Sequence, residues 1–145
     1  MHIRQAAEQD LSRIAEIFVF VRRVQFYPIF QDAGYSFGDL QVLPAIEEFR
    51  PQLEHIYVYD DGIIKGFLHM AGTEIRTLYI DPFFQRQAVG SALIRFAKER
   101  FAADSLWVLE KNPDAIRFYE RHGFRLSGEK EFEEDTVEYL LRMVR

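Results

Sequence analysis

The stretch from Thr73 to Phe101 constrains the fold most, because it indicates a strand, a short polar loop and an amphipathic helix. The strand, Ile75–Ile80, ends at Asp81-Pro82, since proline cannot donate to a sheet ladder. The helix carries apolar residues at near three-and-four spacing, at Val89, Leu93, Phe96, Ala97 and Phe101. The loop Gln85–Ser91 brings backbone N–H groups to a helix N-terminus, which suits a phosphate or pyrophosphate. We therefore predict an anion-binding strand–loop–helix.

The charge and composition argue against several kinds of site. The formal net charge is −5, whereas non-specific nucleic-acid binding uses a basic surface. The chain has no cysteine, which excludes a thiol nucleophile, a disulfide framework and a thiolate metal site. Its four histidines lack the spacing of metal ligands, so we expect no metal.

The length and hydropathy predict one compact unit. A chain of 145 residues favours a single domain over residues 1–145. No uncharged apolar run is long enough to span a bilayer, and the first ten residues lack a signal-peptide pattern. We expect no membrane partner and, by elimination, a cytoplasmic location.

The first third of the chain predicts a short strand and two helices. The strand is His2–Ala6, and a first helix runs from a cap at Asp10 or Ser12 to about Val24. Gln25–Gly38 is expected to be irregular and is rich in aromatic residues, which either pack in the core or line a substrate pocket. A second helix is expected around Leu40–Glu48.

The rest of the chain predicts a mixed sheet. His55–Tyr59 and Ile63–Ala71 form a hairpin, and Glu74–Ile80 follows as a third strand. Asp104–Leu109 is almost wholly apolar, which is typical of a buried strand reached through a helical crossover and parallel to its neighbour. A further helix follows, with Asn112 as its N-cap, Pro113 in its first turn and Gly123 past its end, before closing strands Phe124–Glu129 and Thr136–Met143.

Two motifs, in this order, resemble those of the GCN5-related N-acetyltransferases (GNATs). Gln85-Arg86-Gln87-Ala88-Val89-Gly90 resembles the Q/R-x-x-G-x-G/A loop of that family. Asn112–Phe124 resembles its N-x-x-A-x-x-F-Y-x-x-x-G-F segment. The resemblance runs from Lys65 to the end of the chain, and before Lys65 only the order of the elements fits.

The resemblance implies a fold and a donor. The fold is a single-domain α/β structure with a mixed, mostly antiparallel sheet, a splayed parallel strand pair and helices on both faces. The donor is acetyl-CoA, with no metal, and its pantetheine arm would lie between Glu74–Ile80 and Leu106–Leu109. The residues implied to bind it are Leu78, Tyr79, Ile80, Gln85, Arg86, Gln87, Ala88, Val89, Gly90, Ser91 and Asn112.

The resemblance also implies catalytic groups. Tyr119 would give a proton to the leaving thiolate, since a phenol with a pKa of about 10 is protonated at neutral pH. Glu74 would take the proton of the amine, directly or through water. Strand alternation places Arg76 on the same face as Glu74, so a structural ion pair is the competing interpretation unless a bulge separates them. The oxyanion donor would be a strand N–H near Tyr79.

Ala88 departs from the motif, where glycine is usual. We expect Ala88 to take a helical conformation with φ below zero, since positive φ would strain alanine by about 1 kcal/mol. Gly90 is then the position that cannot accept a side chain.

The function that these features favour is acetyl transfer to a primary amine of a small molecule, peptide or protein. A non-catalytic CoA-binding module of the same fold is the alternative, favoured by Ala88 and by an ion pair of Glu74 with Arg76. The closing strands make a homodimer reasonable.

Overall fold

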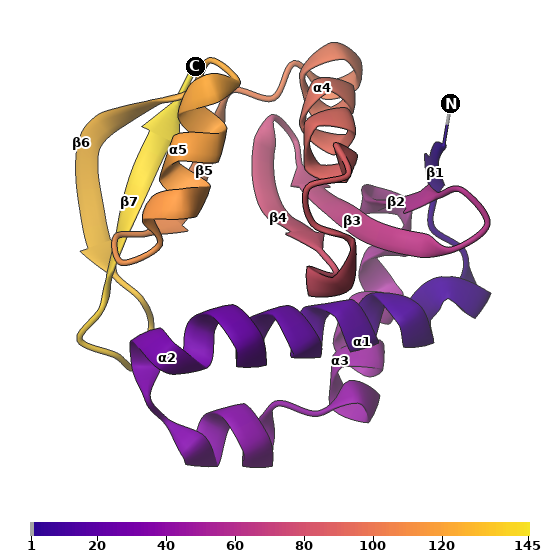
Figure 1. Ribbon diagram of the computed structural model, residues 1–145, viewed down its shortest axis with the longest axis horizontal. Coiled ribbons are helices and arrows are strands. Elements are labelled where there is room, and N and C mark those ends of the chain that lie inside the picture. Colours follow the sequence, from indigo (N-terminus) through magenta and orange to yellow (C-terminus); the bar gives the residue numbers. More distant parts are fainter. Residues whose placement is uncertain (1) are drawn as a thin grey trace.

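The computed structural model describes residues 2–145 as a seven-stranded sheet in the order β1-β2-β3-β4-β5-β7-β6 (Figure 1). Only β4 and β5 are parallel, and every other neighbouring pair is antiparallel. The predicted class, a mixed and mostly antiparallel sheet with one parallel pair, is therefore confirmed.

The first helix is longer than predicted. A 3₁₀ turn, η1 (Glu8–Asp10), leads into α1 (Leu11–Val21), and the chain then continues through a π-helical turn, η2 (Arg22–Phe26), into α2 (Tyr27–Phe30). The expectation that Gln25–Gly38 is irregular is wrong for much of its length, because Tyr35–Asp39 is also a π-helical turn, η3. The helix tolerates Pro28 because this residue follows the widened turn and falls in the first turn of α2, where a missing N–H costs little.

The next elements follow the predicted order with small shifts at their ends. β1 (Ile3–Gln5) pairs with β2 (Ile56–Asp60), which α3 (Val42–Phe49) and the 3₁₀ segment η4 (Arg50–His55) precede. β2, β3 (Ile64–Ala71) and β4 (Glu74–Ile80) form the predicted meander.

The second half holds the parallel strand and the closing strands. It consists of η5 (Pro82–Phe84), α4 (Val89–Phe101), β5 (Ser105–Leu109), α5 (Pro113–Arg121), β6 (Arg125–Phe132) and β7 (Tyr139–Val144). The α5 helix begins as predicted, because the Asn112 side chain accepts a hydrogen bond from the Ala115 N–H at 3.3 Å. Gly123 follows the helix with φ +94°, a conformation that suits glycine.

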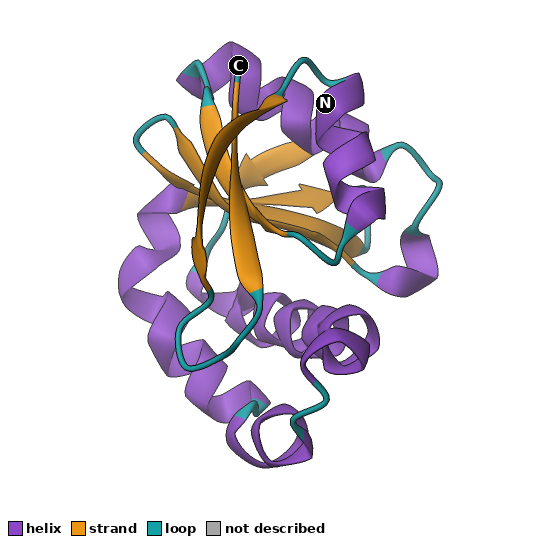
Figure 2. Cartoon of the chain, turned by 90° about the vertical axis from the view of Figure 1, so that its left-hand side faces the viewer, coloured by secondary structure: helices purple, strands orange, loops and turns teal. Residues whose placement is uncertain are grey.

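Helices cover both faces of the sheet (Figure 2). On one face α1 and α3 pack on β2 and β3, around buried residues such as Ile14, Ile17 and Phe67. On the other face α4 and α5 pack on β4, β5 and β7, around Leu93, Leu106 and Met143. The sheet is thus the middle of three layers.

The parallel strands diverge soon after they meet. β4 and β5 pair only through Glu74 with Ser105 and Ile75 with Leu106. Beyond these residues β5 pairs with β7 on its other edge, and β4 continues to pair with β3. This divergence confirms the predicted splayed pair and opens the sheet where the candidate site lies.

Candidate functional site

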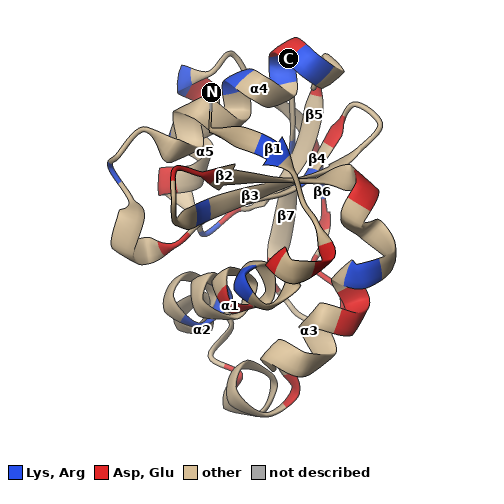
Figure 3. Cartoon of the chain, turned by 90° about the vertical axis from the view of Figure 1, so that its right-hand side faces the viewer, with Lys and Arg blue, Asp and Glu red and all other residues tan. Residues whose placement is uncertain are grey.

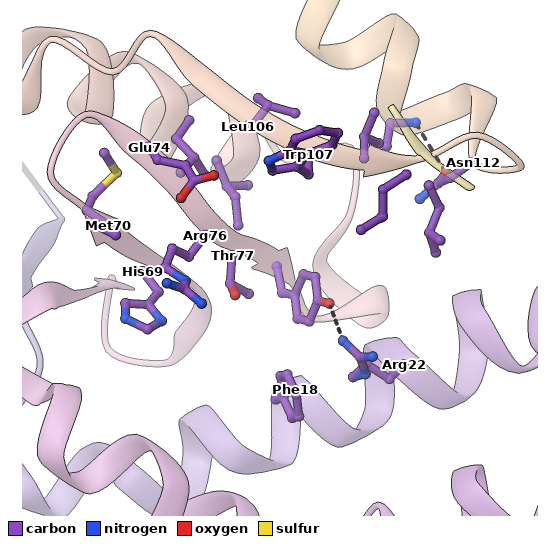
Figure 4. A pocket seen from close by; sticks show the side chains of 18 of the residues that line it. Phe18, Arg22, His69, Met70, Glu74, Arg76, Thr77, Leu106, Trp107 and Asn112 are labelled. Atoms are coloured by element: carbon purple, nitrogen blue, oxygen red, sulfur yellow. Dashed lines mark hydrogen bonds between the residues drawn. The ribbon is translucent and has the colours of Figure 1, made fainter. Parts of the chain in front are cut away.

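A cavity of about 1000 Å³ runs along β4 and into the opening beside β5 (Figure 4). Its walls come from α1, η2, α3, η4, β3, β4, β5 and α5, so both halves of the chain contribute. The lining includes Phe18, Arg22, Glu48, His55, His69, Glu74, Arg76, Thr77, Trp107, Asn112, Tyr119 and Glu133.

The cavity brings together five of the predicted site residues. They are Glu74, Leu78, Tyr79, Asn112 and Tyr119. Ile80 and the loop Gln85–Ser91 do not line it, because they lie at and beyond the end of β4, where the strand gives way to η5 and α4. The predicted set is thus divided between the cavity and the neighbouring loop.

Tyr119 faces the cavity from α5 and is held by two other rings. Its ring packs edge-on against Phe118 at 5.2 Å and Phe124 at 6.1 Å between centroids. Burial raises the pKa of its hydroxyl above the ordinary value, with a smaller contribution from Tyr79. The phenol therefore stays protonated across the physiological range and can act as a proton donor.

A β-bulge separates Glu74 from Arg76. His69 pairs with Thr77 and Met70 pairs with Ile75, so Arg76 is the extra residue on β4. No ion pair joins Glu74 and Arg76 in the part of the chain that the structure describes. Glu74 therefore faces the cavity as a carboxylate that Arg76 does not hold.

His69 lies on β3 beside the bulge and lines the cavity (Figure 4). Its ring packs edge-on against Phe49, with centroids 6.3 Å apart. Burial is the main cause that lowers the pKa of His69, and the nearby Arg76 and His55 side chains lower it further. The imidazole is consequently neutral at pH 7.

The loop before α4 corrects the prediction for Ala88. Ala88 is left-handed at φ 63°, and Arg86 is also left-handed at φ 64°. The expected right-handed conformation is wrong because the loop alternates left-handed residues with others, a geometry that turns successive N–H groups toward one side. Among the described residues, no protein acceptor bonds to the backbone N–H groups of residues 85–91. The loop therefore has the donors that an anion requires.

Packing around Gly90 leaves little room for a side chain. A Cβ at Gly90 would meet the Phe118 ring at 3.2 Å and Ile80 at 3.7 Å. The contact is with α5 and the end of β4, so a larger residue would first disturb the packing of α4 on α5. A loss of ligand affinity in a Gly90→Val variant would therefore not by itself identify a pyrophosphate site.

The sequence matches a known protein family. A model of the acetyltransferase (GNAT) domain matches residues 52–126, just over half of the chain. The chain belongs to the GNAT family.

Named relatives agree with the GNAT assignment over most of the chain. Peptidyl-lysine N-acetyltransferase YiaC of Escherichia coli is 32% identical over 126 residues, which are 86% of this chain and 83% of the relative. Peptidyl-lysine N-acetyltransferase YjaB of Salmonella typhimurium is 28% identical over 135 residues, covering 92% and 90%. This GNAT chain is an N-acetyltransferase.

Solved GNAT structures share the fold at low sequence identity. Apo-form YjaB from Escherichia coli superposes with a TM-score of 0.74 at 22% identity, covering 98% of this chain and 95% of that chain. The PaiA N-acetyltransferase from Thermoplasma acidophilum, solved with coenzyme A, gives 0.66 at 18% identity, covering 99% and 98%. These likenesses support the architecture of the GNAT domain.

Arg22 of this GNAT domain is a cavity residue that we did not predict from the sequence. Arg22 lines the cavity, and its Nη1 donates to the Tyr79 hydroxyl at 3.2 Å. The sequence does contain a pattern that indicates Arg22. This residue is four residues after Phe18 and therefore lies on the apolar face of the first helix. A charged residue at a core-facing position is the pattern that could have identified it.

Residues 2–145 of the GNAT chain contain neither a membrane-spanning helix nor a metal-binding group of side chains. No helix there is long and apolar enough to cross a membrane. No group of three or more His, Cys, Asp or Glu residues there could hold a metal ion. Lys and Arg are interspersed with Asp and Glu on the side shown in Figure 3.

Proposed function

We propose that this N-acetyltransferase moves an acetyl group from acetyl-CoA to a primary amine, with a lysine side chain of a peptide or protein as the first acceptor to test. The observation that carries the proposal is the opening between β4 and β5, with Tyr119 and Glu74 on its walls and a loop of unpaired N–H groups beside it. The relatives named as peptidyl-lysine N-acetyltransferases support the acceptor, and the neighbour solved with coenzyme A supports the donor.

Binding of the donor would use backbone groups more than side chains. The backbone of Leu78–Ile80 lies on the edge of β4 that β5 leaves open, and it would pair with the amides of the pantetheine arm. The N–H groups of Gln85–Ser91 would donate to the pyrophosphate, helped by the partial positive charge at the start of α4. Asn112 would approach the sulfur from the start of α5.

The reaction requires one proton to be removed and one to be supplied. Acetyl-CoA supplies an activated acyl group in the form of a thioester. Glu74 would accept the proton of the amine, directly or through water, as the new C–N bond forms. Tyr119 would donate a proton to the sulfur as the C–S bond breaks, and a strand N–H near Tyr79 would stabilise the developing oxyanion.

A non-catalytic CoA-binding module is less well supported. One feature in its favour was an ion pair between Glu74 and Arg76, and the bulge at Arg76 removes that support. Ala88 remains different from glycine, but its left-handed conformation is one that glycine would also adopt.

Calorimetry with acetyl-CoA, followed by thiol release in the presence of a panel of amines, tests the proposal. We expect saturable binding and turnover on at least one primary amine, with lysine peptides in the panel. Binding without turnover on any amine would favour the module, and a lack of binding would overturn the proposal.

A further inference from the structure

Arg22 places a positive charge at one end of the cavity. It lies in the π-helical turn η2 and reaches toward the end of β4 (Figure 4). Its Nη1 donates to the Tyr79 hydroxyl at 3.2 Å, and its Nε is buried with no hydrogen-bond partner in the described chain. The guanidinium is thus positioned by the fold but has donors that no protein acceptor uses.

The surroundings of Arg22 are aromatic rather than acidic. Its guanidinium carbon lies 5.1 Å from the centre of the Phe18 ring, 5.2 Å from Phe26 and 5.9 Å from Tyr35. Within residues 2–145 no carboxylate lies within 4.0 Å of it, whereas Arg4 and Arg13 each have an ion-pair partner. Cation–π contacts offset only part of the cost of removing a charge from water. A counter-charge from a ligand would offset the rest.

The acidic groups of the cavity lie at more than one place along its walls. Glu74 stands at the start of β4, whereas Arg22 faces the strand's other end, beside Tyr79 (Figure 4). Glu48 also lines the cavity. Burial raises the pKa of the Tyr79 hydroxyl, and Glu133 lies close enough for its charge to raise it further, so Glu133 is on the Arg22 side without forming an ion pair with Arg22 in the described chain. Arg22 and Glu74 therefore face one cavity from opposite ends of β4, which suits a molecule carrying both an amine and an anionic group.

We propose that Arg22, together with the Tyr79 hydroxyl, binds a carboxylate of the acceptor, so that the preferred acceptors are amines that also carry a carboxylate. The planar fork of N–H donors on a guanidinium matches the geometry of a carboxylate, and the amine acceptors of the proposed reaction include molecules that carry one. The inference rests on the proposed acetyl transfer and adds the class of acceptor. The carboxylate comes either from a free amino acid or from an acidic side chain beside a lysine.

The experiment compares matched acceptors. One arm uses ω-aminocarboxylates from glycine to 6-aminohexanoate, each paired with the alkylamine of the same length. The other arm uses lysine peptides with Glu or Gln next to the lysine. We expect at least one carboxylate acceptor to have a kcat/KM about tenfold or more above that of its neutral partner, the size of effect that a charge-assisted hydrogen bond supports. The arm in which this occurs identifies the source of the carboxylate.

Variants of Arg22 identify the binding residue. Arg22→Met should abolish the preference, because kcat/KM should fall more for the carboxylate acceptor than for its neutral partner, which has no group for Arg22 to bind. Arg22→Lys should keep part of the preference, since it keeps the charge but loses the planar fork. Arg100→Met, at the exposed far end of α4, is the matched control and should leave the preference unchanged.

The outcomes separate this inference from the proposed function. Acetyl-CoA binding and turnover with no preference for a carboxylate in either arm would overturn the inference alone, as would an equal loss on both kinds of amine in Arg22→Met. Failure to bind acetyl-CoA or to turn over any amine would overturn both. The wild-type comparison requires no variant, so a misfolded Arg22→Met protein would not prevent the test.

Discussion

At the scale of single residues, a phenol and a carboxylate face one cavity from different elements. Tyr119 comes from α5 and Glu74 from the start of β4, where β4 still pairs with β5. The raised pKa of Tyr119 keeps its proton available, and Glu74 has no ion-pair partner among residues 2–145, where a bulge at Arg76 separates the two side chains. Glu74 can therefore accept a proton and Tyr119 can donate one within the same cavity.

The Tyr119 hydroxyl is expected to contribute to turnover and not to binding. In Tyr119→Phe we expect kcat to fall about 100-fold, a common contribution of a general acid, with unchanged affinity for acetyl-CoA. Because burial raises the pKa of Tyr119, wild-type activity should not decline on its account up to about pH 10. Steady-state rates and calorimetry measure both quantities. The control is Tyr57→Phe, which should keep full activity. The Tyr57 ring packs against Phe96 and Phe101.

Glu74 is expected to control activity on the acidic side of the pH profile. In Glu74→Gln, kcat/KM should fall about 100-fold, and the decline seen on acidification should disappear because the base is gone. Glu99→Gln, exposed on α4, should retain the wild-type profile. An acidic decline that persists in Glu74→Gln would assign the base to another group or to a water chain.

At the scale of elements, the hydrophobic periodicity and the residues that end strands or cap helices predicted most of the elements that surround the site. The end of β4 at Asp81-Pro82, the span of α4 and the Asn112 cap of α5 follow from local chemistry, and the structure contains all three. The continuation of α1 into α2 does not follow from local chemistry, because proline usually ends a helix and only the widened turn at Arg22–Phe26 accommodates it. The same turn carries Arg22, whose role depends on tertiary neighbours that sequence spacing does not specify.

The left-handed conformation of Ala88 predicts opposite effects of one substitution at two positions. Ala88→Gly should raise the free energy of unfolding by about 0.5 kcal/mol. Left-handed alanine is strained by about 1 kcal/mol or more, and relief of this strain is partly offset because glycine loses more backbone conformational entropy on folding. Ala92→Gly, in the regular part of α4, should lower it by about 0.5–1 kcal/mol. Urea unfolding measures both values. Equal losses in the two variants would contradict the strain at Ala88.

At the scale of the whole molecule, a bidentate ion pair ties the first strand to the first helix. Asp10 accepts hydrogen bonds from Arg4 at 2.7 and 3.0 Å and from the Ala7 N–H at 2.8 Å, and its side chain is 5% exposed. Arg4 also bonds to Asp60 at the end of β2. One buried carboxylate therefore ties the turn before α1 to β1 and, through Arg4, to the end of β2.

Asp10 predicts how stability depends on pH. Hydrogen bonds from Arg4, above all, hold the pKa of Asp10 below its usual range in the folded state. Its stabilisation is therefore complete above the unfolded pKa of about 3.9 and is lost as the pH falls through the lower folded value. Asp10→Asn should cost about 1–2 kcal/mol at pH 7, and the gap to wild type should narrow below about pH 4. Urea unfolding across pH measures this gap, and Glu47→Gln, an exposed ion-pair partner of Arg50, should change stability much less.

The short pairing of β4 with β5 has a consequence for the behaviour of the protein in solution. Past Ile75 and Leu106, each strand turns a row of backbone donors and acceptors toward the opening instead of toward a neighbouring strand. Such rows are free sheet edges in the interior of a sheet, and an extended segment of another molecule can add to a free edge. Donor binding and unwanted strand addition would then compete for the same backbone atoms. Acetyl-CoA should accordingly slow the aggregation of concentrated protein, whatever acceptor the enzyme uses.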